Sequence, residues 1–246
     1  MTAADPRLRE HRDVWDRKPV LRGVYAGYHR RLLESLPSEG NILEIGGGSG
    51  NFRDMAQNAI SIDLASSTWV DVCCDAHELP FADGAFVGIA MLDVLHHLAR
   101  PAEFFAEVVR VLRPGGRLAM IEPGMPPLSR PFYTFLHQEP VDMDVDPLAD
   151  QPPEVAADPF QSNQAIPSLL FDRNDHRKKF ANLFPELTIV ERTHFSFMAY
   201  PLSGGFKSWS LLPNAVAPII LKLDDILSPL VGELLGFRIS IVLERF

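Results

Sequence analysis

Short apolar runs alternate with amphipathic segments along the first half of the chain. Continuous or alternating apolar runs indicate strands, and apolar residues spaced by three and four indicate helices. Strands are predicted over residues 41–45, 60–64, 70–75, 86–92 and 117–122. Helices are predicted over residues 20–36, from about 51 to 57, and over 101–112, with a turn at 113–116. Because strands and helices alternate with short connections, the pattern predicts an α/β fold with a doubly wound parallel sheet.

The second half of the chain is less regular. Prolines are frequent between residues 123 and 175, which predicts an irregular insertion. A helix is predicted near residues 176–183, and strands are predicted over 187–193 and 237–243. Residues 219–235 carry a broad apolar stripe at helical period, so an amphipathic helix is predicted there, kinked or restarted at Pro229.

The composition is that of a globular protein, with 46% hydrophobic and 22% charged residues. A formal net charge of −9 disfavours nucleic acid as a partner, because such a surface gains little from counterion release. The two cysteines, Cys73 and Cys74, are adjacent, so we expect no ordinary disulfide, a place in a strand core, and a cytoplasmic location. The charged N-terminus and the lack of a long apolar run predict neither a secretion signal nor a transmembrane segment.

A glycine-rich loop, Gly46-Gly47-Gly48-Ser49-Gly50, follows the first predicted strand. Ligands of open parallel sheets bind beyond the carboxyl ends of the strands, and glycines there let a ligand approach the main chain. With Glu44 the loop reads Glu-x-Gly-x-Gly-x-Gly, and Asn51 stands where a dinucleotide fingerprint needs its third glycine. No Gly-Lys-Ser/Thr follows, which excludes a P-loop.

Two acids end the next two predicted strands. Asp63 ends the second strand, where a carboxylate can accept hydrogen bonds from a ribose diol. Asp75 ends the third, where its carboxylate can accept from an adenine amine while a nearby N–H, at Ala76, donates to a ring nitrogen. The loop and the two acids therefore predict a slot for an adenosine group.

With these features, residues 41–124 resemble the class I S-adenosylmethionine-dependent methyltransferases, most closely the branch of the ubiquinone/menaquinone methyltransferases. Four ordered stretches carry the resemblance: ILEIGGGSG at 42–50, CDAHELPF at 74–81, DVLHHL at 93–98 and LRPGGRL at 112–118. The resemblance implies a Rossmann-like, seven-stranded, mostly parallel sheet with an antiparallel last strand and helical lid insertions. It also implies S-adenosyl-L-methionine as the cofactor.

The resemblance further implies roles for single residues. Glu44 and the loop glycines Gly46, Gly47, Gly48 and Gly50 would line the methionine end of the cofactor. Asp63 would hold the ribose hydroxyls, Leu64 would flank the adenine, and Asp75 with Ala76 would meet its amine side. Met91 or Leu92, ending the fourth strand, would offer a carbonyl to the cofactor's ammonium. The chain departs from the family between Asp63 and Asp75, where eleven residues leave little room for the usual helix.

Methyl transfer from a sulfonium is an in-line displacement that needs a general base only for a weakly nucleophilic acceptor. Candidates for catalytic roles are His96, His97 and Glu122, with His137 as a further group near the mouth. Consecutive side chains diverge, so one of the two adjacent histidines is expected to face the acceptor. No metal site is expected, because the acidic run from Glu139 to Asp146 fits a solvated loop better. The basic cluster at residues 173–179 fits a solvated helix face better than a phosphate site.

The expected organisation is an N-terminal helical segment, residues 1–37, before a methyltransferase domain, residues 38–246. Insertions at about 123–175 and 203–236 would form the side that binds a small-molecule, lipid or glycan acceptor. The 219–235 helix most simply packs on the core, but it could also roof the acceptor, form a homodimer or lie on a membrane; Asp224 and Asp225 on its polar face favour a lid or dimer. A nicotinamide-dependent oxidoreductase and a non-catalytic methyltransferase-like subunit remain as alternatives, and Asn51 opposes the first.

Overall fold

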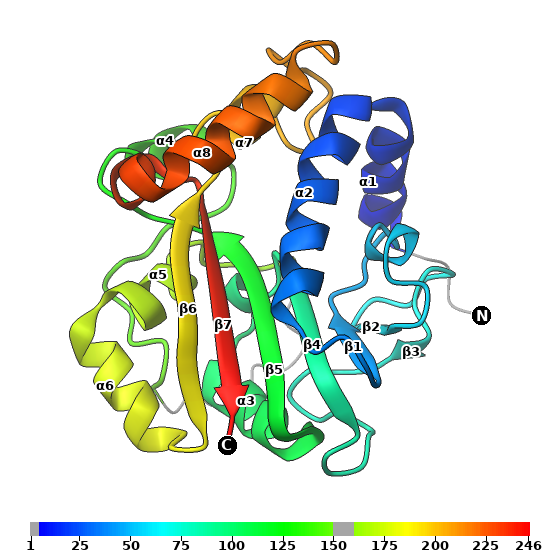
Figure 1. Cartoon of the computed structure of the whole chain (residues 1–246), viewed down its shortest axis with the longest axis vertical. Helices are drawn as coiled ribbons and strands as arrows, with labels where there is room; N and C mark the ends of the chain where they lie inside the picture. Colours follow the sequence, from blue (N-terminus) through cyan, green and yellow to red (C-terminus); the bar gives the residue numbers. More distant parts are fainter. Residues whose placement is uncertain (1–4, 150–159) are drawn as a thin grey trace.

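A seven-stranded mixed sheet forms the centre of the computed structural model, which describes residues 5–149 and 160–246 (Figure 1). The strands are β1 Ile42–Ile45, β2 Ile60–Asp63, β3 Val72–Cys73, β4 Phe86–Leu92, β5 Leu112–Pro123, β6 Leu187–Phe195 and β7 Arg238–Arg245. Their order across the sheet is β3-β2-β1-β4-β5-β7-β6, and β7 is antiparallel to both neighbours. The predicted doubly wound sheet and its antiparallel last strand are confirmed.

Helices cover both faces of the sheet. On one face α3 (Pro101–Val111), α5 (Ile166–Asp172) and α6 (Asn174–Leu183) bury phenylalanines against the strands, among them Phe105, Phe171 and Phe180. On the other face α2 (Pro19–Ser35) packs Leu21, Val24 and other residues against the small side chains of β4 and β5. The helix predicted over 20–36 and the helix predicted over 101–112 are thus confirmed to within one residue.

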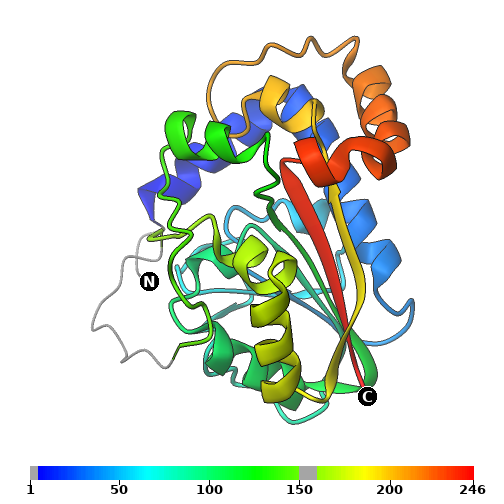
Figure 2. The same cartoon turned by 90° about the vertical axis from the view of Figure 1, so that its left-hand side faces the viewer.

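A further layer of helices lies beyond the carboxyl ends of β1, β4 and β5. It consists of α1 (Pro6–Arg17), α4 (Arg130–Leu136), α7 (Ala199–Ser203) and α8 (Ala217–Leu235). Figure 2 shows this layer as a cap over one end of the sheet. The amphipathic helix predicted over 219–235 is present as α8 and continues through Pro229 without a break. No helix of the two described ranges is long and apolar enough to cross a membrane.

Three local predictions were wrong. The helix expected from about 51 to 57 is only a short 3-10 turn, Phe52–Asp54, because the chain has just nine residues between Gly50 and Ile60 in which to turn back and enter β2. The third strand pairs only at Val72–Cys73, and Cys73 is exposed instead of lying in a strand core. The 113–116 turn belongs to β5 as an irregularity, since Phe86 pairs with Leu112 while Gly88 pairs with Arg117. In agreement with the expectation from its length, the segment between Asp63 and Asp75 contains no helix.

Candidate functional site

The glycine loop lies where β1 and β4 diverge, which is the switch point of this strand order. The N–H groups of Gly46 and Gly47 both donate to the carbonyl of Ile62 at 2.9 Å. The N–H of Gly48 donates to Oδ2 of Asp63 at 2.8 Å. The carbonyl of Ile62 and the carboxylate of Asp63, both in β2, therefore hold the glycine loop that follows β1.

Three glycines of the loop leave no room for a side chain, and a Cβ on Gly47 would lie only 2.0 Å from Oγ of Ser61. Gly46 has φ of +79°, and a Cβ there would lie 2.2 Å from Cγ2 of Val94. Gly50 has φ of +76°, and a Cβ there would lie 2.7 Å from Cβ of Trp69. Both positions combine a left-handed backbone with close packing, so only glycine fits without rearrangement.

Glu44 lies buried beneath the loop. Burial raises the pKa of its carboxyl to about 7, although a contact with Ser61 and the nearby Arg53 oppose the shift. Its Oε2 has no hydrogen-bond partner, and a Cβ on Gly47 would lie 3.3 Å from it. This buried carboxylate oxygen is therefore an unused acceptor at this edge of the sheet.

The remaining residues predicted to contact the cofactor follow the same edge. Leu64, after Asp63, is 51% exposed, and Ala76 is buried. Asp75 accepts a hydrogen bond from the N–H of His77 at 2.9 Å and pairs with the ring Nδ1 of His77 at 2.6 Å. Burial opposes the charge of Asp75, but these bonds lower its pKa. The Asp75 carboxylate thus organises its own turn, and Leu92 ends β4 beside the site.

Helix α1 covers the glycine loop. The Arg12 guanidinium donates to the carbonyl of Ser49 at 3.2 Å, and Cδ2 of Leu8 lies 3.7 Å from the position of a Cβ on Gly48. Lys18, which follows α1, donates to the carbonyls of Gly205, Lys207 and Trp209 at 2.7, 2.8 and 2.8 Å. The N-terminal helices are therefore fastened both to the loop and to the chain after α7.

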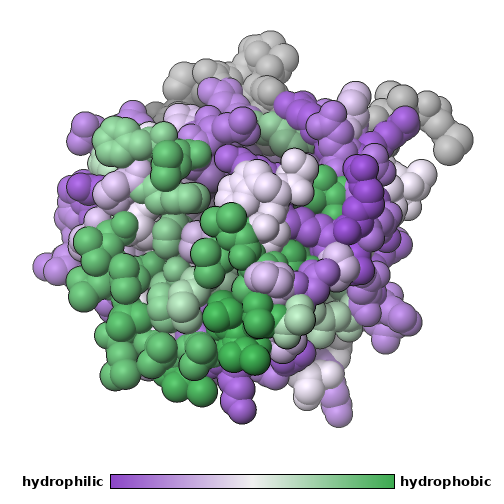
Figure 3. Space-filling view, turned by 90° about the horizontal axis from the view of Figure 1, so that it is seen from above, coloured by the Kyte–Doolittle hydropathy of each residue, from purple (hydrophilic) through white to green (hydrophobic). Residues whose placement is uncertain are grey.

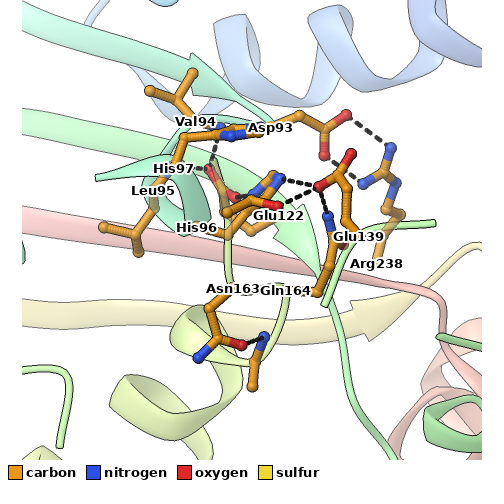
Figure 4. Close-up of polar contacts among 12 residues, drawn as sticks. Asp93, Val94, Leu95, His96, His97, Glu122, Glu139, Asn163, Gln164 and Arg238 are labelled. Atoms are coloured by element: carbon orange, nitrogen blue, oxygen red, sulfur yellow. Dashed lines mark hydrogen bonds and ion pairs between the residues drawn. The ribbon is translucent and has the colours of Figure 1, made fainter. Parts of the chain in front are cut away.

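A chain of acid, histidine and acid lies beyond the end of β5, with Glu122 and His96 buried and Glu139 half-buried (Figure 4). Oε1 of Glu122, at the end of β5, accepts from the N–H groups of Val94 and Leu95 at 2.8 Å. Oε2 of Glu122 lies 2.6 Å from Nδ1 of His96, and Nε2 of His96 lies 3.6 Å from Oε2 of Glu139. Burial disfavours the imidazolium, but the two carboxylates outweigh it and raise the pKa of His96 to about 9.

His97 has the opposite electrostatic environment. Its ring lies 4.2 Å from that of His96, and its Nδ1 donates to the carbonyl of Gln161 at 3.1 Å. Burial and the neighbouring His96 charge lower the pKa of His97 to about 4. At neutral pH the pair therefore consists of a charged His96 and a neutral His97 whose Nε2 retains its lone pair.

Sequence reasoning missed the buried ion pair of Asp93 and Arg238. Nη2 of Arg238 lies 2.8 Å from Oδ2 of Asp93, and Nη1 contacts the other carboxylate oxygen. All four tyrosines of the chain gather around this pair: Tyr25, Tyr28, Tyr133 and Tyr200. Asp93 has φ of +60°, an unusual backbone for a non-glycine residue. No local pattern indicates such a cluster, because its members come from five separate segments.

The acidic run does not form one solvated loop. Glu139 accepts from Ser162 at 2.8 Å and from Gln164, and it faces His96, so its predicted place in a solvated loop was wrong. Asp146 instead pairs with Lys179 of the basic cluster at 2.6 Å. His137 lies against the ring of Tyr133 and has a pKa lowered by burial.

One ligand atom from each of His96, His97 and Glu139 lies within 4.8 Å of the other two, as does one from each of Asp93, His96 and Glu122. These groups have the composition of metal ligands. Both ring nitrogens of His96 already face carboxylates, and Asp93 faces Arg238, so the same contacts form a complete network of ion pairs.

A family model described as a methyltransferase domain matches residues 43–120. The chain is 38% identical over 63 residues to the ubiquinone/menaquinone biosynthesis C-methyltransferase of Desulfotalea psychrophila, covering 26% of this chain and 25% of that protein. It is 32% identical over 124 residues to the enzyme of the same name from Roseobacter denitrificans, covering 39% and 50%. The chain thus spans at most about half the length of these two relatives.

Among solved structures, an S-adenosylmethionine-dependent methyltransferase from Archaeoglobus fulgidus matches 91% of this chain and 94% of its own. The TM-score is 0.54 at 17% identity, so this likeness concerns the fold. The sheet order with its antiparallel β7, the glycine loop after β1 and the match over residues 43–120 agree. Residues 43–120 therefore match a methyltransferase domain, and the chain as a whole has the fold of that solved S-adenosylmethionine-dependent methyltransferase.

Proposed function

We propose that this protein transfers the methyl group of S-adenosylmethionine to a small-molecule, lipid or glycan acceptor. One observation carries the proposal: the glycine loop held by Asp63 and the His96-His97 turn lie at the same edge of the sheet, within the matched segment. Donor and acceptor groups would thus meet over the ends of β1 and β4.

The residues at this edge suit the donor. The unpartnered Oε2 of Glu44 offers a hydrogen-bond acceptor. The glycines let a ligand approach the main chain, and the exposed side chain of Leu64 offers an apolar surface. Asp63 would bind ribose hydroxyls with the carboxylate that now accepts from Gly48 and Ala65. When bound, the donor supplies an electrophilic methyl group on a sulfonium with a neutral thioether as leaving group.

The two histidines would have different roles at the acceptor, His97 as a general base and His96 as a positioning residue. Neutral His97 can take the proton of a hydroxyl or amine through Nε2, because its Nδ1–H is held by Gln161. Charged His96 is a positioning residue, since Glu122 and Glu139 fix both of its ring nitrogens. Two groups whose environments move their pKa values apart are a common arrangement for acid and base roles.

Donor binding is tested by titration calorimetry with S-adenosylmethionine, S-adenosylhomocysteine and NAD. We expect heat from the first two only, and an affinity reduced roughly 10-fold or more in Asp63→Ala, because a charge-assisted hydrogen bond is lost. Asp83→Ala is the matched control, since Asp83 is an exposed acid beside Arg110. Heat from NAD alone would support an oxidoreductase instead, and donor binding without methyl transfer to any extract component would support a non-catalytic subunit.

The role of His97 predicts a pH profile. Transfer of labelled methyl to the acceptor fraction should be constant between about pH 5 and pH 8. It should fall on the acid side as His97 gains a proton and on the alkaline side as His96 loses one. His97→Ala should reduce turnover roughly 100-fold or more, whereas His176→Ala, whose Nδ1 bonds to Leu169 away from the site, should not. Imidazole NMR titrations that place both histidines near pH 6.5 would contradict the assignment.

A further inference from the structure

Helix α8 presents its large aliphatic side chains to solvent. Ile219, Leu223, Ile226, Leu230 and Leu234 follow one another at spacings of three and four residues and are 39% to 79% exposed. The spacing places them in a single stripe along the helix. The apolar residues of this helix were expected to pack on the core, but these five side chains face away from the protein.

The fully buried residues of α8 are small or polar, namely Ala217, Asp224, Ser228 and Gly232, and only Ile220 and Leu221 beside them pack aliphatic side chains on the core clusters. Asp224 is buried and accepts from the N–H groups of Met198 and Ala199 at 2.9 and 2.6 Å, so its expected place on a solvated face was wrong. Gly232 packs so closely that a Cβ would lie 2.0 Å from the carbonyl oxygen of His194. A surface helix ordinarily turns its apolar side toward the core. The large apolar residues on the outward side of α8 therefore indicate that an apolar partner covers this side.

Two other segments extend this surface. Leu128, Phe135 and Leu136 around α4 are 61%, 80% and 66% exposed, and the N–H of Leu128 donates to the carbonyl of Leu234 in α8. Trp209, Leu211 and Val216 are exposed in the loop that leads into α8. We call the α8 stripe with these six residues the apolar face. Figure 3 shows hydrophobic residues gathered over one side of this end of the molecule.

The charge around the apolar face differs from that of the whole chain. Segments 128–136 and 207–235 carry Arg130, Lys207 and Lys222 against Asp224, Asp225 and Glu233, so they sum to zero while the chain carries −9. Asp224 is buried, and Glu233 pairs with Arg192 at 3.2 Å. Three exposed cations and one unburied aspartate therefore border the face. Such a border complements a headgroup layer with some negative charge, whereas a second copy would bring the same cations together.

We propose that the apolar face binds a lipid bilayer in the plane of its surface. α8 would lie at the boundary of headgroups and acyl chains, with the exposed ring of Phe135 and the indole of Trp209 inserted beside it. α4 leads directly into Glu139, whose carboxylate faces His96, so the bound surface would lie next to the acceptor side of the site. The proposal does not depend on methyl transfer.

Sedimentation with sucrose-loaded vesicles of pure phosphatidylcholine, and of phosphatidylcholine with about 30% phosphatidylglycerol, tests the proposal. We expect the full chain to bind both, with tighter binding to the second. The double variant Ile226→Asp, Leu230→Asp should lose at least about 10-fold in partitioning to both vesicles. Lys222→Glu should weaken binding only to the anionic vesicles. Leu183→Asp, at an exposed leucine at the end of α6, is the matched control and should bind as the parent does.

Light scattering and circular dichroism complete the test. The double variant should keep its fold, because both side chains are exposed, and its heat of S-adenosylhomocysteine binding should equal that of the parent. The proposal would be overturned if the parent failed to bind one or both vesicle types. It would also be overturned if the double variant bound vesicles as well as the parent does. A parent dimer that the double variant converts to monomers, without vesicle binding, would identify a second copy as the occupant and also overturn it.

Discussion

Glu122→Ala is expected to lower the free energy of unfolding by about 3–5 kcal/mol, because the variant leaves three buried donors without an acceptor. These donors are the N–H groups of Val94 and Leu95 and the ring Nδ1–H of His96. Without this carboxylate the turn that carries both histidines loses its anchor to β5. Urea denaturation followed by circular dichroism at neutral pH measures the change.

Two further variants make the Glu122 prediction specific. Glu244→Ala removes an acid on the adjacent strand that pairs with Arg117 at 2.8 Å at the surface, and it should cost less than about 1 kcal/mol. Glu122→Gln retains an oxygen for the two N–H groups but not the charge opposite His96. Compared with Glu122→Ala, it should recover part of the free energy of unfolding. It should bind the donor as the parent does, but it should not transfer methyl groups, because the charge opposite His96 is missing. Equal losses for Glu122→Ala and Glu244→Ala would contradict the anchoring role.

Gly46→Ala is expected to cost roughly 2–4 kcal/mol of stability and to abolish measurable donor binding. The left-handed backbone alone costs an alanine about 1–2 kcal/mol, and the clash with Val94 adds to it. Val94 cannot retreat freely, because its N–H is held by Glu122. Thermal unfolding and calorimetry with S-adenosylhomocysteine measure the two effects.

Gly27→Ala is the matched control for the glycine loop. Gly27 lies within α2, has no neighbour within 4 Å of the place a Cβ would take, and does not need a left-handed backbone. Alanine should therefore stabilise the protein by about 0.5–1 kcal/mol, since it favours the helix. Parental stability and donor affinity in Gly46→Ala would show that Val94 yields to the added methyl group and that the loop is loosely packed.

The residues proposed to bind the donor could be located from the sequence because they belong to local patterns. A strand, its terminal residues and the loop that follows are contiguous, so Gly46, Asp63 and Asp75 could be placed from spacing and from the family resemblance. Even here the α-helix expected after the loop was wrong, because apolar spacing does not show how soon the chain must return to the sheet.

The proposed acceptor side depends on contacts between distant segments. Glu139 reaches His96 from an insertion with no periodicity, and Arg238 reaches Asp93 across 145 positions. Their residue types give no indication of a partner. For α8 the helical period was correct, but the buried side was not, since Asp224 caps a neighbouring helix and displaces leucines outward.

Lys18 joins the helix that covers the glycine loop to the chain after α7. Its ammonium is bound by three carbonyls of residues 205–209, while α1, just before it, lies on the glycine loop. Moving α1 off the loop would therefore either break three charge-assisted hydrogen bonds of Lys18 or carry residues 205–209 along with the helix. If the donor binds at the glycine loop as proposed, its exchange would require α1 and residues 205–209 to move as one unit.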